Sequence, residues 1–173
     1  MLTIRKWMVA ALGVAVVVLA NPNTGWAQSS VEARLKAFED QAEIERLLLD
    51  YGRHLDARDF AGYSSLFAKD GEWVGGFGTV AGPANIKAFM EKAMPGENKV
   101  KNYHLLSNFV VTVSGDTATA WSRWAFVTPG QQGAVISQAG RYDDTLVREG
   151  GRWRFKKRVA SNDTGGPPPP AAR

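Results

Sequence analysis

The sequence contains no cysteine among its 173 residues. A chain without thiols cannot build a disulfide framework, and it offers neither a thiolate nucleophile nor a zinc–thiolate site. Its stability must therefore come from packing. The chain is long enough for one domain with one hydrophobic core.

Histidine is scarce, since only His54 and His104 are present. They lie far apart in the sequence and form neither an HxH nor an HExxH pattern, so we expect no metal site. No glycine-rich loop follows a predicted strand and opens a helix, which disfavours nucleotide binding. Ser64 and Ser65 lack the strand–turn–helix context of a nucleophilic serine. The options for acid–base chemistry are therefore few.

The apolar run at residues 8–20 is shorter than the roughly 20 residues that span a bilayer. Arg5 and Lys6 precede it, and Gly25 and Ala27 supply small residues at the positions that a signal peptidase reads. We expect residues 1–27 to be a cleaved signal peptide, which makes the mature protein periplasmic or secreted, without a stable membrane anchor. A permanent anchor is the alternative.

Net charge is also small. The formal value of +4 falls to +2 when Arg5 and Lys6 are removed with the signal peptide. Residues 152–158 hold a cluster of cations, but Trp153 and Phe155 alternate with them, which predicts a half-buried strand with a solvated cationic face. We therefore expect no nucleic-acid partner.

Helices are predicted in the first half of the chain and strands in the second. Ser29 and Glu32 have the spacing of a capping box, which predicts a first helix from there to about Ala57. The other expected elements are a helix over residues 60–67 capped by Asp59, a turn at 69–71, short strands at 72–74 and 78–80, a helix beginning at Pro83, and strands over 101–113, 117–128, 134–147 and 152–159.

Helices followed by an antiparallel meander indicate an α+β domain, with helices covering one face of a bent sheet, over residues 28–162. The glycine- and proline-rich tail, residues 163–173, is expected to be disordered. Such a sheet tends to close over a pocket. The aromatic side chains that could line it, or could simply form core, are Trp73, Phe77, Phe89, Trp121, Trp124, Phe126 and Tyr142.

The end of the first helix carries polar groups beside an apolar stripe. Residues 44, 47, 48, 51 and 55 recur at spacings of three and four, so Tyr51 is buried and its hydroxyl needs an internal partner. His54 lies at the edge of the stripe, where we expect a surface pair with Asp50 or Arg58. Asp56 points inward only if the helix unwinds near Ala57.

His104 lies at the start of a predicted central strand, where a structural role is the ordinary interpretation. A carboxylate bonded to one ring nitrogen would fix its tautomer and make the other nitrogen a general base near neutral pH. Asp56 could supply that carboxylate. Asp143, Asp144 and Glu149 are expected to be solvated near a hairpin end.

Several motifs in this order resemble the SnoaL-like branch of the nuclear transport factor two-like superfamily. They are Tyr51 with Asp56, residues 66–73 (LFAKDGEW), residues 82–86 (GPANI), His104 with Asn108, and residues 151–155 (GRWRF). The resemblance covers nearly all of residues 31–160. It implies a cone-shaped α+β fold, with N-terminal helices on a strongly curved, mostly antiparallel mixed sheet that encloses a pocket.

Within that superfamily the pattern is similar to scytalone dehydratase, hexachlorocyclohexane dehydrochlorinase and bile acid 7-alpha-dehydratase. The resemblance implies a cofactor-free lyase acting on a carbon–oxygen or carbon–halide bond, or an isomerase, in which His104 is the base, Asp56 supports it and Tyr51 assists. It places Arg148 near an arginine of the dehydrochlorinase. Gly75 replaces the catalytic aspartate of ketosteroid isomerase, and Thr128 replaces a further acid of the bile acid enzyme.

We therefore expect the catalytic residues to be His104, Asp56 and Tyr51. The small cyclic or apolar substrate would be bound by Trp73, Phe89, Trp124, Phe126 and Arg148. A homodimer or homotrimer is expected. The alternative is a periplasmic binding or assembly module of the same fold that turns nothing over.

Overall fold

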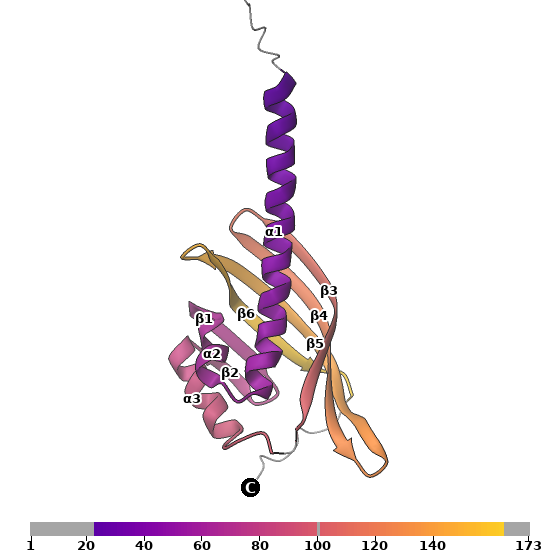
Figure 1. Cartoon of the computed structure of the whole chain (residues 1–173). Helices are drawn as coiled ribbons and strands as arrows, with labels where there is room; N and C mark the ends of the chain where they lie inside the picture. The colour runs from indigo at the N-terminus through magenta and orange to yellow at the C-terminus, as the bar shows by residue number, and fades with distance from the viewer. Residues whose placement is uncertain (1–22, 100, 165–173) are drawn as a thin grey trace, which may run out of the picture. The chain divides into compact units, whose positions relative to one another are not determined.

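The computed structural model describes residues 23–99 and 101–164 (Figure 1). The elements, in chain order, are α1 (Asn23–Asp56), α2 (Phe60–Ser65), β1 (Phe67–Gly75), β2 (Gly78–Ala81), α3 (Pro83–Ala93), β3 (Tyr103–Ser114), β4 (Thr117–Gly130), β5 (Gly133–Glu149) and β6 (Arg152–Asn162). Most of the predicted signal peptide and tail lies outside the described residues. Two compact units, Met1–Arg34 and Leu35–Arg173, divide the chain, and the second contains the whole sheet.

The sheet has six strands in the order β2-β1-β6-β5-β4-β3. The prediction that His104 lies on a central strand is wrong, because β3 is an edge strand that, among the described strands, pairs with β4 alone. Strands β3 to β6 form the predicted antiparallel meander, while β1 pairs in parallel with β6. The part of α1 from Leu35 onward, together with α2 and α3, contributes to one hydrophobic core with the inward side chains of the strands. The α+β prediction is confirmed, and the mixed sheet is not closed.

The apolar stripe predicted at the end of α1 is confirmed, because Ile44, Leu47, Leu48, Tyr51 and Leu55 are all buried. The predicted start of this helix is wrong, since the described helix already begins at Asn23. A serine within a helix costs only a few tenths of a kcal/mol, so the capping-box pattern did not impose a boundary.

α1 ends where the chain turns sharply. Arg58 has φ of 59°, and its backbone N–H donates to the Leu55 carbonyl at 3.1 Å. The next residue, Asp59, caps α2 as predicted, accepting a hydrogen bond from the Gly62 N–H at 2.9 Å. The helix therefore unwinds just after Asp56, as the inward orientation of the Asp56 side chain requires.

The turn predicted at residues 69–71 is wrong, because they continue β1. The register between β1 and β6 shifts between Phe67 and Glu72. A Cβ on Gly71 would lie 2.6 Å from the Phe155 carbonyl oxygen. This glycine therefore permits a close backbone approach at an irregularity rather than a reversal of the chain.

Two aromatic side chains do not take the inward positions expected of them. Trp121 lies between the buried Ala120 and Ser122 on β4, so its side chain is on the opposite face of the sheet. The guanidinium of the exposed Arg123 lies 5.2 Å from the Trp121 ring centre. Phe77, between β1 and β2, is 59% exposed. Neither residue belongs to the interior.

The cationic face predicted for β6 is also wrong at one position. Leu146 pairs with Phe155 whereas Thr145 pairs with Lys157, so Lys156 is an extra residue in the ladder. This bulge changes the alternation of β6 and turns Arg158 inward, where it is fully buried.

Candidate active site

Asp56 and His104 lie in direct contact at the junction of α1 and β3. The Asp56 Oδ1 atom is 2.6 Å from His104 Nδ1, and Asp56 Oδ2 accepts a hydrogen bond from the His104 backbone N–H at 2.9 Å. The expected contact between these two side chains is confirmed. Their side chains remain 20% and 13% exposed, so the pair is sheltered without being sealed.

A neighbouring loop holds the helix end against the strand. The Asn98 side-chain amide donates to the Asp56 carbonyl at 3.0 Å and to the Asn102 carbonyl at 2.8 Å. Arg58 follows closely, and burial lowers its pKa below the usual value, although the Asp56 charge opposes this. The position of Asp56 is thus fixed from three sides: by its own helix, by the loop and by β3.

The contact has a chemical consequence for the imidazole ring. An ionised carboxylate is only an acceptor, so its bond to Nδ1 favours the tautomer that carries the proton on Nδ1. The Nε2 atom of His104 then carries the free lone pair. An orientation fixed by a carboxylate and a free second nitrogen are what a general base requires.

Two of the predicted aromatic residues lie beside this ring. The ring centre of Phe126 is 4.8 Å from that of His104, and that of Trp124 is 6.3 Å away. Trp124 is fixed by its indole N–H, which donates to the Arg141 carbonyl at 3.2 Å. The imidazole therefore has an aromatic wall on its β4 side.

Tyr51 lies deeper, with 2% of its surface exposed. Its oxygen accepts a hydrogen bond from the Trp73 indole N–H at 3.0 Å and is 2.8 Å from the Tyr63 hydroxyl. The predicted need for an internal partner is confirmed. Tyr63 is the donor of the second bond, so the Tyr51 proton is available to another acceptor.

The other two aromatic residues predicted to bind substrate, Trp73 and Phe89, are linked to Tyr51 and not to His104. Trp73 is buried, and its ring centre is 5.4 Å from that of the half-buried Phe89. The structure thus joins Trp73 and Phe89 to Tyr51, and joins Trp124 and Phe126 to His104. Tyr142 links the two groups, with ring centres 5.4 Å from Tyr51 and 6.0 Å from Trp124.

A buried ion pair beneath Tyr51 was missed by sequence reasoning. Arg158 binds Asp144 through two hydrogen bonds of 2.8 and 2.6 Å, and both side chains are fully buried. The guanidinium carbon lies 3.9 Å from the Tyr51 ring centre and 4.1 Å from that of Tyr142. The prediction that Asp144 is solvated is wrong.

Burial has opposite effects on the two members of this pair. It raises the pKa of the Asp144 carboxyl despite the nearby cation. It also lowers the pKa of Arg158, but the charge and hydrogen bonds of Asp144, together with Tyr51 and Tyr142, outweigh burial and raise that pKa above the usual value. Burial raises the pKa of the Tyr63 and Tyr142 hydroxyls well above their usual range, so both stay neutral at physiological pH.

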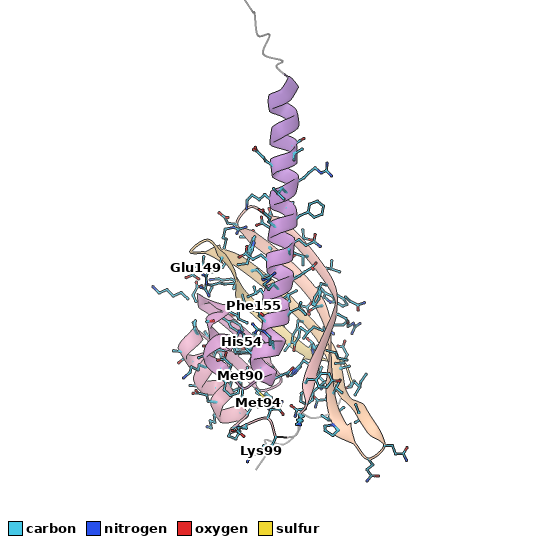
Figure 2. The ribbon with its side chains drawn as sticks, viewed as in Figure 1. His54, Met90, Met94, Lys99, Glu149 and Phe155 are labelled. Carbon is cyan, nitrogen blue, oxygen red and sulfur yellow. The ribbon has the colours of Figure 1, made fainter. Side chains whose placement is uncertain are left out.

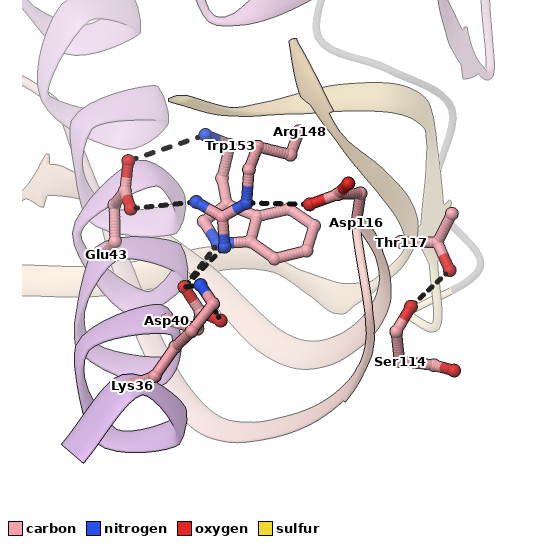
Figure 3. A network of polar contacts seen from close by, with 8 residues as sticks. All are labelled: Lys36, Asp40, Glu43, Ser114, Asp116, Thr117, Arg148 and Trp153. Atoms are coloured by element: carbon pink, nitrogen blue, oxygen red, sulfur yellow. Dashed lines mark hydrogen bonds and ion pairs between the residues drawn. The ribbon is translucent and has the colours of Figure 1, made fainter. Parts of the chain in front are cut away.

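Arg148 does not belong to this site. Its guanidinium contacts Asp40, lies 3.1 Å from Asp116 and stacks 4.4 Å from the Trp153 ring centre (Figure 3). Asp40 precedes Asp56 on α1 by 16 residues, a separation of about 24 Å along a helix. The expected role of Arg148 in binding substrate beside the histidine is therefore wrong, since its charge is neutralised far from it.

Two surface hollows lie outside the histidine–aspartate pair. One, of about 670 Å³, is lined mainly by charged residues that include Lys69, Glu72 and Lys157. The other, of about 320 Å³, is lined by residues that include Tyr103 and Pro129. Within the described residues, no group of three or more acidic or histidine side chains could hold a metal ion. No helix in this part of the chain has an apolar stretch long enough to cross a bilayer.

Comparison with known proteins agrees with this architecture. A model of the SnoaL-like domain matches residues 36–159. An uncharacterised protein of Mycobacterium tuberculosis is 32% identical over 126 residues, which cover 69% of this chain and 83% of the relative.

Two solved structures from Novosphingobium aromaticivorans are similar. An NTF2-like protein with a cystatin-like fold is 29% identical with a TM-score of 0.70, over 80% of this chain and 91% of its own. A candidate scytalone dehydratase is 26% identical with a TM-score of 0.59, over 73% and 85%. The protein therefore belongs to the SnoaL-like family of NTF2-like α+β proteins.

Proposed function

We propose that this protein is a lyase that needs no cofactor and eliminates water or a halide from a small cyclic or apolar molecule. The observation that carries the proposal is the Asp56–His104 contact, in which the carboxylate holds both the ring and the backbone of the histidine. A carboxylate used in this way orients one ring nitrogen and leaves the other free to accept a proton.

The reaction would begin at a C–H bond next to the carbon that bears the leaving group. Nε2 of His104 takes the proton, the C–H electron pair forms the new C=C bond, and the bond to the leaving group breaks. A halide departs with its electron pair, and the imidazolium then gives its proton to the solvent. A hydroxyl departs as water after it receives the proton from the imidazolium, so the histidine returns to its neutral form.

Tyr51 would assist by donating a hydrogen bond to an oxygen on which negative charge develops. The bonds that its oxygen accepts leave the hydroxyl proton available, and the Arg158 cation lies against its ring. Arg158 is buried and acts through Tyr51, so its part is that of a positioning residue. Trp124 and Phe126 provide an apolar wall for a cyclic substrate.

The second candidate is a binding or assembly module of the same fold, exported but without turnover. Export itself remains a proposal, and mass spectrometry of the exported protein would test it by finding Gln28 at the mature N-terminus. An intact N-terminus embedded in the membrane would contradict it.

The deciding experiment screens hydroxylated and halogenated cyclic compounds with no cofactor added, and measures the alkene product or free halide. The wild-type protein should form product. Asp56→Asn should keep its fold but lower the rate by a factor of about 10²–10⁴. A binding module would retain the compound unchanged. Equal rates in the wild type and in Asp56→Asn would contradict the mechanism.

A further inference from the structure

Helix α1 has an apolar stripe on the side opposite its buried face. Leu35, Phe38 and Leu49 are 56%, 66% and 50% exposed. Together with the exposed Ala42 they follow the alternating spacing of three and four residues, with Glu45 completing the series. From Leu35 to Leu49 the helix makes nearly four turns, so this spacing keeps the stripe on one side of the helix. The core stripe that begins at Ile44 lies on the other side.

Opposite charges flank the stripe along one edge. Glu39 and Arg46 are seven residues apart, which is the heptad repeat, and both are exposed. Within the described residues neither side chain forms an ion pair, whereas the nearby Lys36 and Arg53 are paired with Asp40 and Asp50. The edge therefore presents an unpaired acid and an unpaired base in a row.

We propose that two copies of this chain associate through the stripe, with their α1 helices antiparallel. In this arrangement Glu39 of each copy faces Arg46 of the other, which forms two equivalent ion pairs about a two-fold axis. The same register places Phe38 against Leu49 of the second copy and the small Ala42 against the stem of Glu45. Apolar and charged contacts are thus satisfied by one register.

A parallel pair fits less well. Equivalent residues would then meet across the axis, which would place Glu45 against Glu45 in the middle of the apolar seam. In the part of the chain that the structure describes, Glu45 forms no ion pair, and its carboxylate accepts a hydrogen bond from the uncharged Gln41 at 3.0 Å. No cation on its own helix therefore offsets that repulsion. The antiparallel arrangement avoids this contact.

The size of the stripe sets the strength of the association. From Leu35 to Leu49 it extends about 21 Å along the helix, and it holds three large apolar side chains. A stable complex commonly buries about 800 Å² on each partner. The copies should therefore be in a concentration-dependent monomer–dimer equilibrium. This proposal is independent of the proposed reaction.

Sedimentation equilibrium of the full-length protein tests the surface. The wild type should dimerise, and Phe38→Glu should weaken the dimer by about tenfold or more, because it places a charge in the apolar seam. Ile136→Glu is the matched control, since Ile136 is equally exposed but lies on β5. A wild type that remains monomeric at about 1 mM, or a dimer that resists Phe38→Glu, would overturn the proposal.

A charge exchange tests the antiparallel register. Glu39→Arg alone and Arg46→Glu alone should each weaken the dimer, because each places like charges opposite one another twice. An equimolar mixture of the two variants should dimerise again, since the two bases of one variant then face the two acids of the other. Circular dichroism verifies that both variants fold. Failure of the mixture to recover would exclude this register.

Discussion

The molecule contains two histidine–aspartate pairs of nearly equal length close to the turn that ends α1. The His104–Asp56 distance is 2.6 Å and the His54–Asp59 distance is 2.7 Å. Figure 2 shows His54 on the last turns of α1. The distances alone therefore do not distinguish a candidate general base from an ordinary local contact.

Their surroundings do distinguish them. Asp59 is 49% exposed, and its second oxygen caps α2, so the pair joins neighbouring residues of one helix–turn–helix segment. Asp56 is less exposed, and its second oxygen holds the backbone of a residue 48 positions later. A long-range carboxylate beside an aromatic wall is therefore the feature that indicates catalysis, whereas the local pair closes a turn.

The largest expected difference between the two pairs is in turnover. His104→Gln should lower the elimination rate by about 10²–10⁴, because glutamine has no proton acceptor near neutral pH. His54→Gln, the matched variant, should leave the rate unchanged. Steady-state rates of both variants on the same substrate check this. An equal loss of rate in the two variants would contradict the claim that His104, and not His54, is the general base.

The next effect concerns the stability of the interior beneath Tyr51. Arg158→Met leaves the Asp144 carboxylate buried without its cation, and should lower the free energy of unfolding by about 3–5 kcal/mol. Adding Asp144→Leu should recover part of that loss, because no uncompensated charge remains. Urea unfolding of the wild type and of both variants measures the loss and the recovery. A double variant less stable than Arg158→Met would contradict this account of the pair.

The smallest effect is expected at the local pair. Asp59→Ala removes the cap of α2 and should cost about 1 kcal/mol of stability. The Gly62 N–H bond lowers the pKa of Asp59 below its usual value, so the folded state favours the charged form. This contribution is fully present above the usual pKa of an aspartate and is lost as the pH falls through the lower folded pKa. Thermal unfolding at about pH 7 and about pH 2 should show a smaller difference between wild type and Asp59→Ala at the acidic pH.

The end of α1 and the start of α2 could be predicted from the sequence because they depend on local periodicity and residue type. The buried stripe, the position of Tyr51 and the cap at Asp59 follow from spacing and residue type alone. The Asp56–His104 contact needed more, namely the resemblance to a family and the expectation that the helix unwinds beside Ala57. That contact was confirmed, whereas the catalytic roles stay predictions.

The error at Arg158 arose because one extra residue changes which face of the strand the following side chains occupy. Strict alternation would leave Arg158 in solvent, but the extra residue Lys156 turns it inward. A single sequence gives no sign of that bulge. Gly71 was misread for a related reason, since a glycine that permits close packing and a glycine that permits a turn look alike. The choice of Arg148 failed because its carboxylate partners come from distant parts of the chain.

The most direct test of the central claim is a double-mutant cycle for elimination, with wild type, Asp56→Asn, His104→Gln and the double variant. If the two side chains act as one base, each single variant should lose most of the rate, and the double variant should be little worse than His104→Gln. Additive losses, with the double variant reduced by the product of the two single effects, would contradict the claim that Asp56 acts through His104.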